Sequence, residues 1–147
     1  MKKKTKNRIE FRQGDALFVF TLNTTRNKKI AGKGEKIFQT YSYSRQQFEL
    51  ANIGHKITMD SFFKADQAVC FDCPFSQNRG CYTAKANQYA GFLSSLRSIG
   101  KKQKWEDIPE YSEDIGQQII NMAKDRYVRL GTYGEPSLIP IPVSYTH

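Results

Sequence analysis

The sequence predicts an α/β (or α+β) fold, built as a small single domain over residues 1–147 with a partial parallel sheet. Two observations lead to this fold class. The N-terminal half holds two short β-favouring runs, and the second half reads as a cysteine loop, a helix, a second helix and a strand that ends in a glycine turn. The chain is 39% apolar, which is enough to build one core without disulfide bonds.

The first strand is expected at residues 16–22, "ALFVFTL", a run of apolar and β-favouring residues bounded by Gly14 and Asn23. Residues 23–36, "NTTRNKKIAGKGEK", are rich in turn-forming and basic residues and indicate an exposed loop. A second strand follows at residues 36–44, "KIFQTYSYS", where the residue types alternate.

One or two helical turns are expected at residues 44–52, whereas the apolar positions of residues 55–71 follow no single period. Residues 82–99 form the clearest helical pattern, because their apolar residues recur at spacings of three and four, and Gly100 is expected to end this helix. The residues of that pattern are Ala86, Tyr89, Ala90, Leu93, Leu96 and Ile99.

The polar segment 101–114 is expected to connect this helix to another across the surface. A second helical pattern passes through Ile115, Ile119, Ile120 and Ala123. It is followed by a strand at 127–132, and the chain then turns at Gly131, Gly134 and Pro136.

The positive charge is concentrated near the N-terminus. Residues 1–36 hold eleven Lys and Arg against three acidic residues, whereas residues 37–147 hold twelve and eleven. Contacts with nucleic acid are therefore expected mainly in the N-terminal third, beginning with a basic flexible tail at about 1–10. A tail that only improves solubility explains the basic residues at positions 2–8 at least as well.

No membrane segment is expected, because the chain lacks a run of eighteen apolar residues and its basic start is followed by polar residues. The sequence thus predicts a soluble, cytoplasmic protein. In a reducing cytosol the three cysteines do not make a disulfide framework, which favours metal or redox chemistry for them.

Cys70, Cys73 and Cys81 lie within twelve residues, and the interval between the second and third is polar. Thiolates on one short loop can chelate a metal at little ordering cost. A structural zinc site would need a fourth ligand, whereas a 4Fe-4S cluster held by three thiolates leaves one iron open for a small molecule. The candidates for a fourth zinc ligand are His55, His147 and Asp72. Three buried cysteines without metal are a further alternative.

The glycine turn after the last strand is the second candidate site. Gly134, Glu135 and Pro136 would expose backbone carbonyls and one carboxylate at the carboxyl edge of the sheet, where α/β proteins bind ligands. An ordinary tight turn is the simpler interpretation of these residues taken alone.

Together the two motifs resemble the N-terminal part of the radical S-adenosylmethionine superfamily. In that superfamily a three-cysteine loop holds a 4Fe-4S cluster, and a later strand ends in a motif of the type G-G-E-P, which contacts the methionyl amino group. The resemblance implies that Cys70, Cys73 and Cys81 ligate the cluster and that Gly134, Glu135 and Pro136 bind S-adenosylmethionine. It also implies that the strand at 127–132 is the parallel neighbour of a strand that leads into Cys70. The cysteine spacing differs from the superfamily's usual C-x3-C-x2-C, and Tyr133 replaces the first glycine.

The chain is more similar to an uncharacterised phage and plasmid family, the gene-product-88-like group. That group carries a "C-P … G-x-C-Y" loop and a later "V-R-L-G-x-Y-G-D-P" segment. Here they are matched by Cys73-Pro74, by Gly80 to Tyr82 and by residues 128–136, with Glu135 in place of Asp. The resemblance implies a protein of the host cytoplasm.

Two functions therefore remain open from the sequence. One is an iron-sulfur protein that resembles a partial radical S-adenosylmethionine enzyme of unidentified substrate. The other is a zinc-stabilised accessory module that binds nucleic acid through its basic N-terminal third. The sequence indicates neither an oligomeric state nor a serine or cysteine hydrolase triad.

Overall fold

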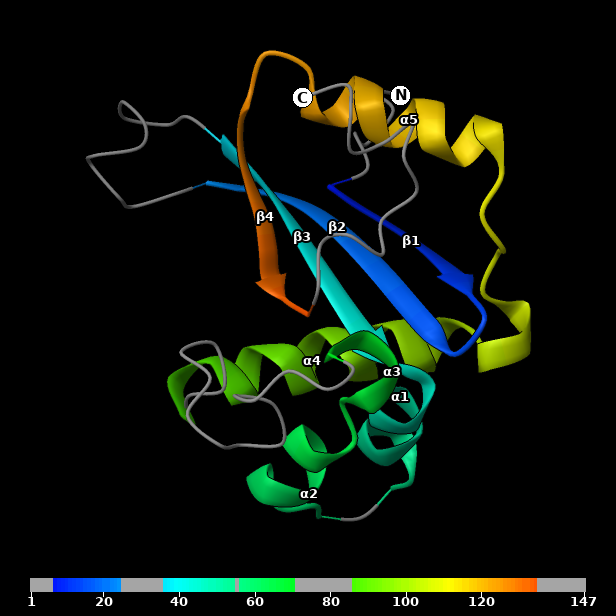
Figure 1. Ribbon diagram of the computed structural model, residues 1–147, viewed down its shortest axis with the longest axis vertical. Helices are drawn as coiled ribbons and strands as arrows, with labels where there is room; N and C mark the ends of the chain where they lie inside the picture. Colours follow the sequence, from blue (N-terminus) through cyan, green and yellow to red (C-terminus); the bar gives the residue numbers. More distant parts are fainter. Residues whose placement is uncertain (1–6, 25–35, 55, 71–85, 135–147) are drawn as a thin grey trace.

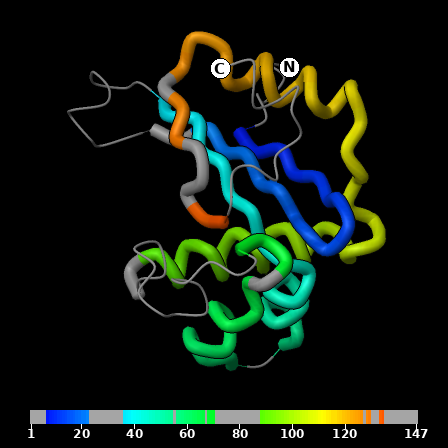
Figure 2. The backbone as a smooth tube through the Cα atoms, in the orientation of Figure 1, coloured from blue at the N-terminus to red at the C-terminus, as the bar shows by residue number. Residues whose placement is uncertain are grey.

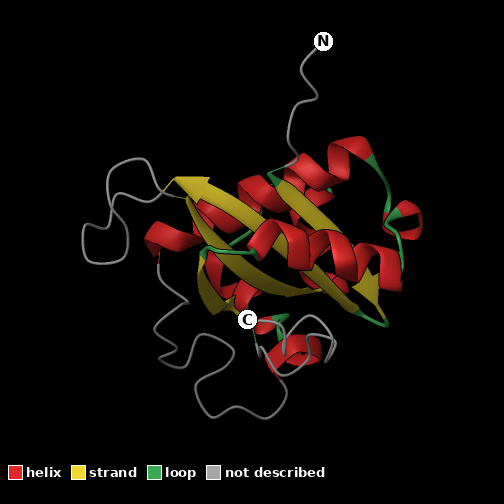
Figure 3. Ribbon diagram, turned by 90° about the horizontal axis from the view of Figure 1, so that it is seen from above, coloured by secondary structure: helices red, strands yellow, loops and turns green. Residues whose placement is uncertain are grey.

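The computed structural model describes residues 7–24, 36–54, 56–70 and 86–134, and Figure 1 shows the arrangement of these segments. It confirms the mixed α/β fold class: one four-stranded sheet has the order β1-β2-β3-β4, and its last pair is parallel. Helices lie on both faces of the sheet, with α5 on one side and α1, α2 and α4 on the other (Figures 1 and 3).

Three strands are antiparallel neighbours in chain order. β1 (Arg8–Gln13) and β2 (Ala16–Thr24) form a hairpin, and β3 (Lys36–Ser44) pairs with β2. The hairpin turns at Gly14, whose φ of 58° is a left-handed conformation that suits glycine.

β1 begins inside the stretch that the sequence assigns to a flexible tail. Ile9 and Phe11 face the core, while the charged residues between and beside them point the other way. β1 is therefore a short amphipathic edge strand. A count of charges along the sequence does not detect such a strand.

β4 (Tyr127–Tyr133) pairs with β3 in parallel, as the order of helices and strand predicts. The connection between β3 and β4 contains α1 (Arg45–Asn52), α2 (Met59–Lys64), α3 (Gln67–Cys70), α4 (Ala86–Lys102), the 3₁₀ turn η1 (Trp105–Asp107) and α5 (Glu113–Ala123). The path from α4 through η1 to α5, which takes the chain from one face of the sheet to the other, can be followed in Figure 2.

The two faces of the sheet differ in composition. We call the face that packs against α1, α2 and α4 the tyrosine face, made by Leu17, Val19, Tyr41, Tyr43 and Tyr133. We call the opposite face, packed against α5, the phenylalanine face, made by Phe11, Phe18, Phe20 and Phe38. Because both faces are covered, residues 16–20 of β2 are apolar at every position and show no alternation with polar residues.

Four sequence predictions need correction: the strand before Cys70, the parallel neighbour of β4, the surface connection at 101–114 and the helix end at Gly100. The segment before Cys70 is not a strand, because α2 and α3 occupy it, and the parallel neighbour of β4 is β3. The segment 101–114 is not wholly a surface connection, since Trp105 and Ile108 are buried.

Gly100 does not end α4, which continues to Lys102. The glycine is needed for another reason: a Cβ at this position would overlap the side-chain amide of Asn52 in α1. That amide donates a hydrogen bond to the carbonyl of Leu96 over 3.1 Å, so α1 and α4 touch closely at this point.

Candidate functional site

The carboxyl ends of β3 and β4 meet at one edge of the sheet, because the two strands are parallel and Tyr41 is paired with Tyr133. This is the edge at which open α/β sheets bind ligands. The chain leaves β3 through Ser44 into α1, and it leaves β4 through Gly134.

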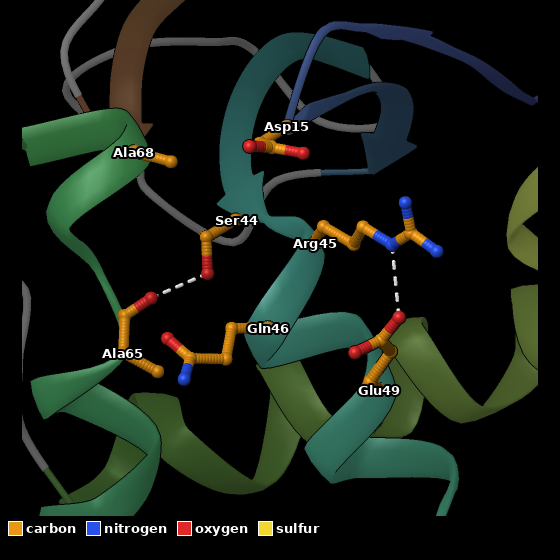
Figure 4. Close-up of a pocket in the computed structure, with 7 residues that line it drawn as sticks. All are labelled: Asp15, Ser44, Arg45, Gln46, Glu49, Ala65 and Ala68. Carbon is orange, nitrogen blue, oxygen red and sulfur yellow. Dashed lines mark hydrogen bonds and ion pairs between the residues drawn. The ribbon is translucent and has the colours of Figure 1, made fainter.

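A pocket of about 420 Å³ lies at the end of β3 (Figure 4). Its described lining comes from the β1–β2 turn, from the end of β3 and the first turns of α1, from the C-cap of α2 and from α3. The residues are Asp15, Ser44, Arg45, Gln46, Glu49, Ala65 and Ala68.

The first turn of α1 is closed by the protein itself. The Ser44 hydroxyl accepts the backbone N–H of Gln47 at 3.0 Å, and the Gln47 side chain accepts the backbone N–H of Ser44 at the same distance. The Arg45 N–H donates to the carbonyl of Asp15 over 2.7 Å. Most backbone N–H groups at the N-terminus of α1 therefore already donate to other groups of the protein. This makes the helix end a weaker binding site for anions.

Arg45 is the cation of the pocket, and it is also engaged. Its Nε lies 2.9 Å from the Glu49 carboxylate, its Nη2 lies 3.5 Å from Glu106, and its guanidinium lies 5.6 Å from the ring centroid of Trp105. The hydrogen bond to Glu49 raises the pKa of Arg45. The described lining thus combines one cation with the carboxylates of Asp15 and Glu49.

Gln47, in α1, connects the end of β4 to α2 through side-chain hydrogen bonds. Its Nε2 donates to the Tyr133 hydroxyl at 2.8 Å and to the Phe62 carbonyl at 3.1 Å, and the side chain is fully buried. The ring of Tyr133 packs 4.8 Å from that of Phe92 and 5.6 Å from that of Tyr43, centroid to centroid. Tyr133, which stands where the resemblance expects a glycine, is therefore a core residue.

Gly134 follows directly and has a φ of 82°. A Cβ at this position would lie 2.7 Å from the Cβ of Ser42 and 2.8 Å from its carbonyl oxygen, so both the backbone conformation and the close approach to β3 require glycine. Glu135 and Pro136, the other two residues of the predicted ligand turn, lie outside the described residues.

Cys70 is the last residue of α3 and is partly buried against the phenylalanine face, next to the fully buried Val69. The N–H groups of these two residues both donate to the carbonyl of Asp66 at 2.9 Å. Cys73 and Cys81 lie outside the described residues, and within the described ranges no three His, Cys, Asp or Glu side chains gather as metal ligands.

The sequence motifs point to Cys70 and Gly134 as site residues but do not single out Gln47, Ser44 or Arg45, which lie where β3 ends. The pattern S-x-x-Q at Ser44 and Gln47 is a capping-box signature that could have marked the start of α1. No comparable signal in the sequence reveals that the same glutamine reaches Tyr133, which lies 86 positions away.

Comparison of the chain with protein-family models, with curated proteins and with solved structures yields no match in any of the three. The resemblances drawn from the cysteine loop and the glycine turn therefore stay predictions. None of the helices in the described part of the chain has the length and apolar character required to cross a membrane.

Proposed function

We propose that Cys70, Cys73 and Cys81 hold a 4Fe-4S cluster with one open iron, and that Gly134, Glu135 and Pro136 bind S-adenosylmethionine next to it. The protein would then be a whole or partial enzyme of radical S-adenosylmethionine type. When bound, such a cluster supplies an electron to the sulfonium group of the cosubstrate.

The proposal rests on the positions of Gly134 and of the residues that precede Cys70. Gly134 packs against Ser42 near the end of β3. The segment leading into Cys70 is tied to the same strand end, where the Ser44 hydroxyl donates a hydrogen bond to the Ala65 carbonyl. Both motifs therefore begin at one edge of the parallel pair, and a small molecule that must touch both requires this proximity.

The donor chemistry is consistent with the cluster. Three thiolates from one short loop suit iron-sulfur ligation, and Cys70 is partly exposed at the end of its helix. The carboxylate of Glu135 would pair with the ammonium group of the cosubstrate, as a charge-assisted hydrogen bond.

Anaerobic purification followed by visible absorption and by iron, sulfide and zinc analysis tests the metal. The expected result is bound iron and sulfide in equal amounts, which each of the changes Cys70→Ser, Cys73→Ser and Cys81→Ser lowers. Zinc without sulfide would contradict the cluster and support the zinc-stabilised accessory module.

Calorimetry on the cluster-loaded protein tests the cosubstrate. Glu135→Gln should weaken binding of S-adenosylmethionine while the iron content stays at the parent value. Glu110→Gln is the matched control, because the Glu110 carboxylate is bound to Arg12 at 3.1 Å, outside the predicted ligand turn. Equal affinity of the parent and the Glu135→Gln protein would refute the assignment of the turn.

A further inference from the structure

The positive charge outside the N-terminal third is concentrated at the end of α4. Residues 97–104 contain four basic residues and no acidic one, whereas residues 105–114 contain five acidic residues and no basic one. The near-zero net charge of residues 37–147 therefore conceals two neighbouring segments of opposite sign. Lys101, Lys102 and Lys104 are all exposed.

The fold brings this segment against the start of β1. The Arg8 Nη1 donates to the Ser98 hydroxyl at 3.2 Å, and the Gln103 side-chain amide donates to the Glu10 carboxylate at 3.3 Å. Two basic segments that lie about ninety positions apart in the sequence thus share one surface.

A groove of about 740 Å³ follows this junction along the edge strand β1. Arg8 and Lys102 supply its positive charge, and Glu10 supplies the acidic side chain in its described lining. Most of the remaining residues carry neutral hydrogen-bonding side chains; the full described lining is Asn7, Arg8, Ile9, Glu10, Ser98, Lys102, Gln103, Pro109, Ile115 and Gln118.

We propose that this groove and the exposed lysines beside it, Lys101 and Lys104, form a binding surface for the phosphate backbone of double-stranded nucleic acid. Cationic and amide side chains are the groups that contact phosphates. The acidic segment that follows α4 repels a polyanion and so limits the surface on that side. The proposal is independent of the metal, since none of its residues belongs to the cysteine loop.

The side chains present favour backbone contacts over base stacking. Proteins that bind single strands place aromatic rings on the binding surface. In the described lining of this groove there is no aromatic residue, and the exposed large apolar side chain of the described chain is Ile53. We therefore expect duplex binding without sequence preference.

Fluorescence anisotropy with a labelled DNA duplex, measured on the full chain over a range of salt concentrations, tests the surface. The double change Lys101→Gln and Lys102→Gln should lower the affinity and reduce the salt slope by about 2. The matched control changes two exposed lysines elsewhere, Lys56→Gln and Lys64→Gln, and should leave both quantities nearly at the parent values.

Glu10→Gln gives a test in the opposite direction. The Glu10 carboxylate lies 3.4 Å from the Arg8 guanidinium, so removing its charge frees Arg8 for a phosphate and should tighten DNA binding. Lower or unchanged affinity in Glu10→Gln would remove the groove from the binding surface.

Other outcomes overturn the proposal. Equal losses in the two lysine double variants would show that only net charge matters. A drop in melting temperature with unchanged DNA affinity would show that Lys101 and Lys102 only stabilise the carboxyl end of α4. Binding of polyglutamate with the same affinity as the DNA duplex would assign the surface to acidic peptides. Tighter binding of single-stranded DNA than of the duplex would contradict a duplex-binding surface. A duplex RNA probe, measured beside the DNA duplex, shows which of the two nucleic acids binds more tightly.

Discussion

The two faces of the sheet are both apolar, but they hold their helices by different means. On the phenylalanine face, Phe11 and Phe20 stack with centroids 5.7 Å apart and pack against aliphatic side chains of α5. On the tyrosine face, Tyr43 and Tyr133 pack among further rings, and the buried Gln47 binds the Tyr133 hydroxyl.

This difference separates general packing from directional contacts. Apolar packing tolerates substitutions that keep volume, whereas a buried amide or hydroxyl needs a particular partner at a particular place. The candidate site lies where β3 and β4 end, and the directional contacts of Gln47 are what hold those ends to α1 and α2. The following predictions test whether the two faces differ as described.

The largest effect is expected from Phe63→Ala on the tyrosine face. Phe63 is fully buried, and its ring lies 5.3 Å from that of Phe62 and 5.8 Å from that of Tyr133, centroid to centroid. Loss of the ring should cost about 3–5 kcal/mol of unfolding free energy. On the phenylalanine face, Ile119→Val should cost about 0.5–1.5 kcal/mol, as measured by denaturant unfolding.

Gln47→Leu should come next. It replaces the buried amide by an apolar side chain of similar length and so removes the hydrogen bonds to the Tyr133 hydroxyl, the Phe62 carbonyl and the Ser44 N–H. The Phe62 carbonyl still accepts the Ala65 N–H. We therefore expect a total cost of about 1–3 kcal/mol of unfolding free energy. The double variant with Tyr133→Phe should lose less than the sum of the two single variants. Strict additivity in that cycle would show that the amide and the hydroxyl are not coupled.

Two glycines of α4 should respond with opposite signs to the same change. Gly100→Ala places a methyl group on the Asn52 side chain and should destabilise by about 1–3 kcal/mol. Gly91→Ala meets nothing within 4 Å and should stabilise by up to about 1 kcal/mol through helix propensity. Equal melting temperatures of the two variants would contradict the close contact between α1 and α4.

Alkaline pH should weaken the tyrosine face selectively. Burial raises the pKa of Tyr43 well above its ordinary value of 10.0, with further contributions from Tyr41 and Tyr133. Because the unfolded state releases this proton first, stability is full below pH 10 and falls as the pH rises above it. Tyr43→Phe should flatten this decline, whereas Phe38→Leu on the other face should lower stability without changing its slope; a parent-like slope in Tyr43→Phe would assign the decline to other groups.

Much of the fold was predictable because its signals are local. The apolar run of β2, the spacing of apolar residues in α4 and α5, and the order of helices before β4 all follow from residues close together in the chain. Cys70 and Gly134 were likewise selected from short motifs, and their roles in a site stay predictions.

The rest depended on contacts between distant residues. The strand β1 is stabilised by pairing with β2, and the contact with Asn52 requires glycine at position 100. Gln47 can bind the Tyr133 hydroxyl only because β4 ends beside α1 in the folded chain. A residue's type and its neighbours in sequence do not specify which group from another element will reach it. The sequence by itself therefore determined β2, β3, α4, α5, β4 and the candidate motifs, whereas β1, α2 and α3 became visible only in the structure. The tertiary structure also decided which strand ends, helices and charges share a surface.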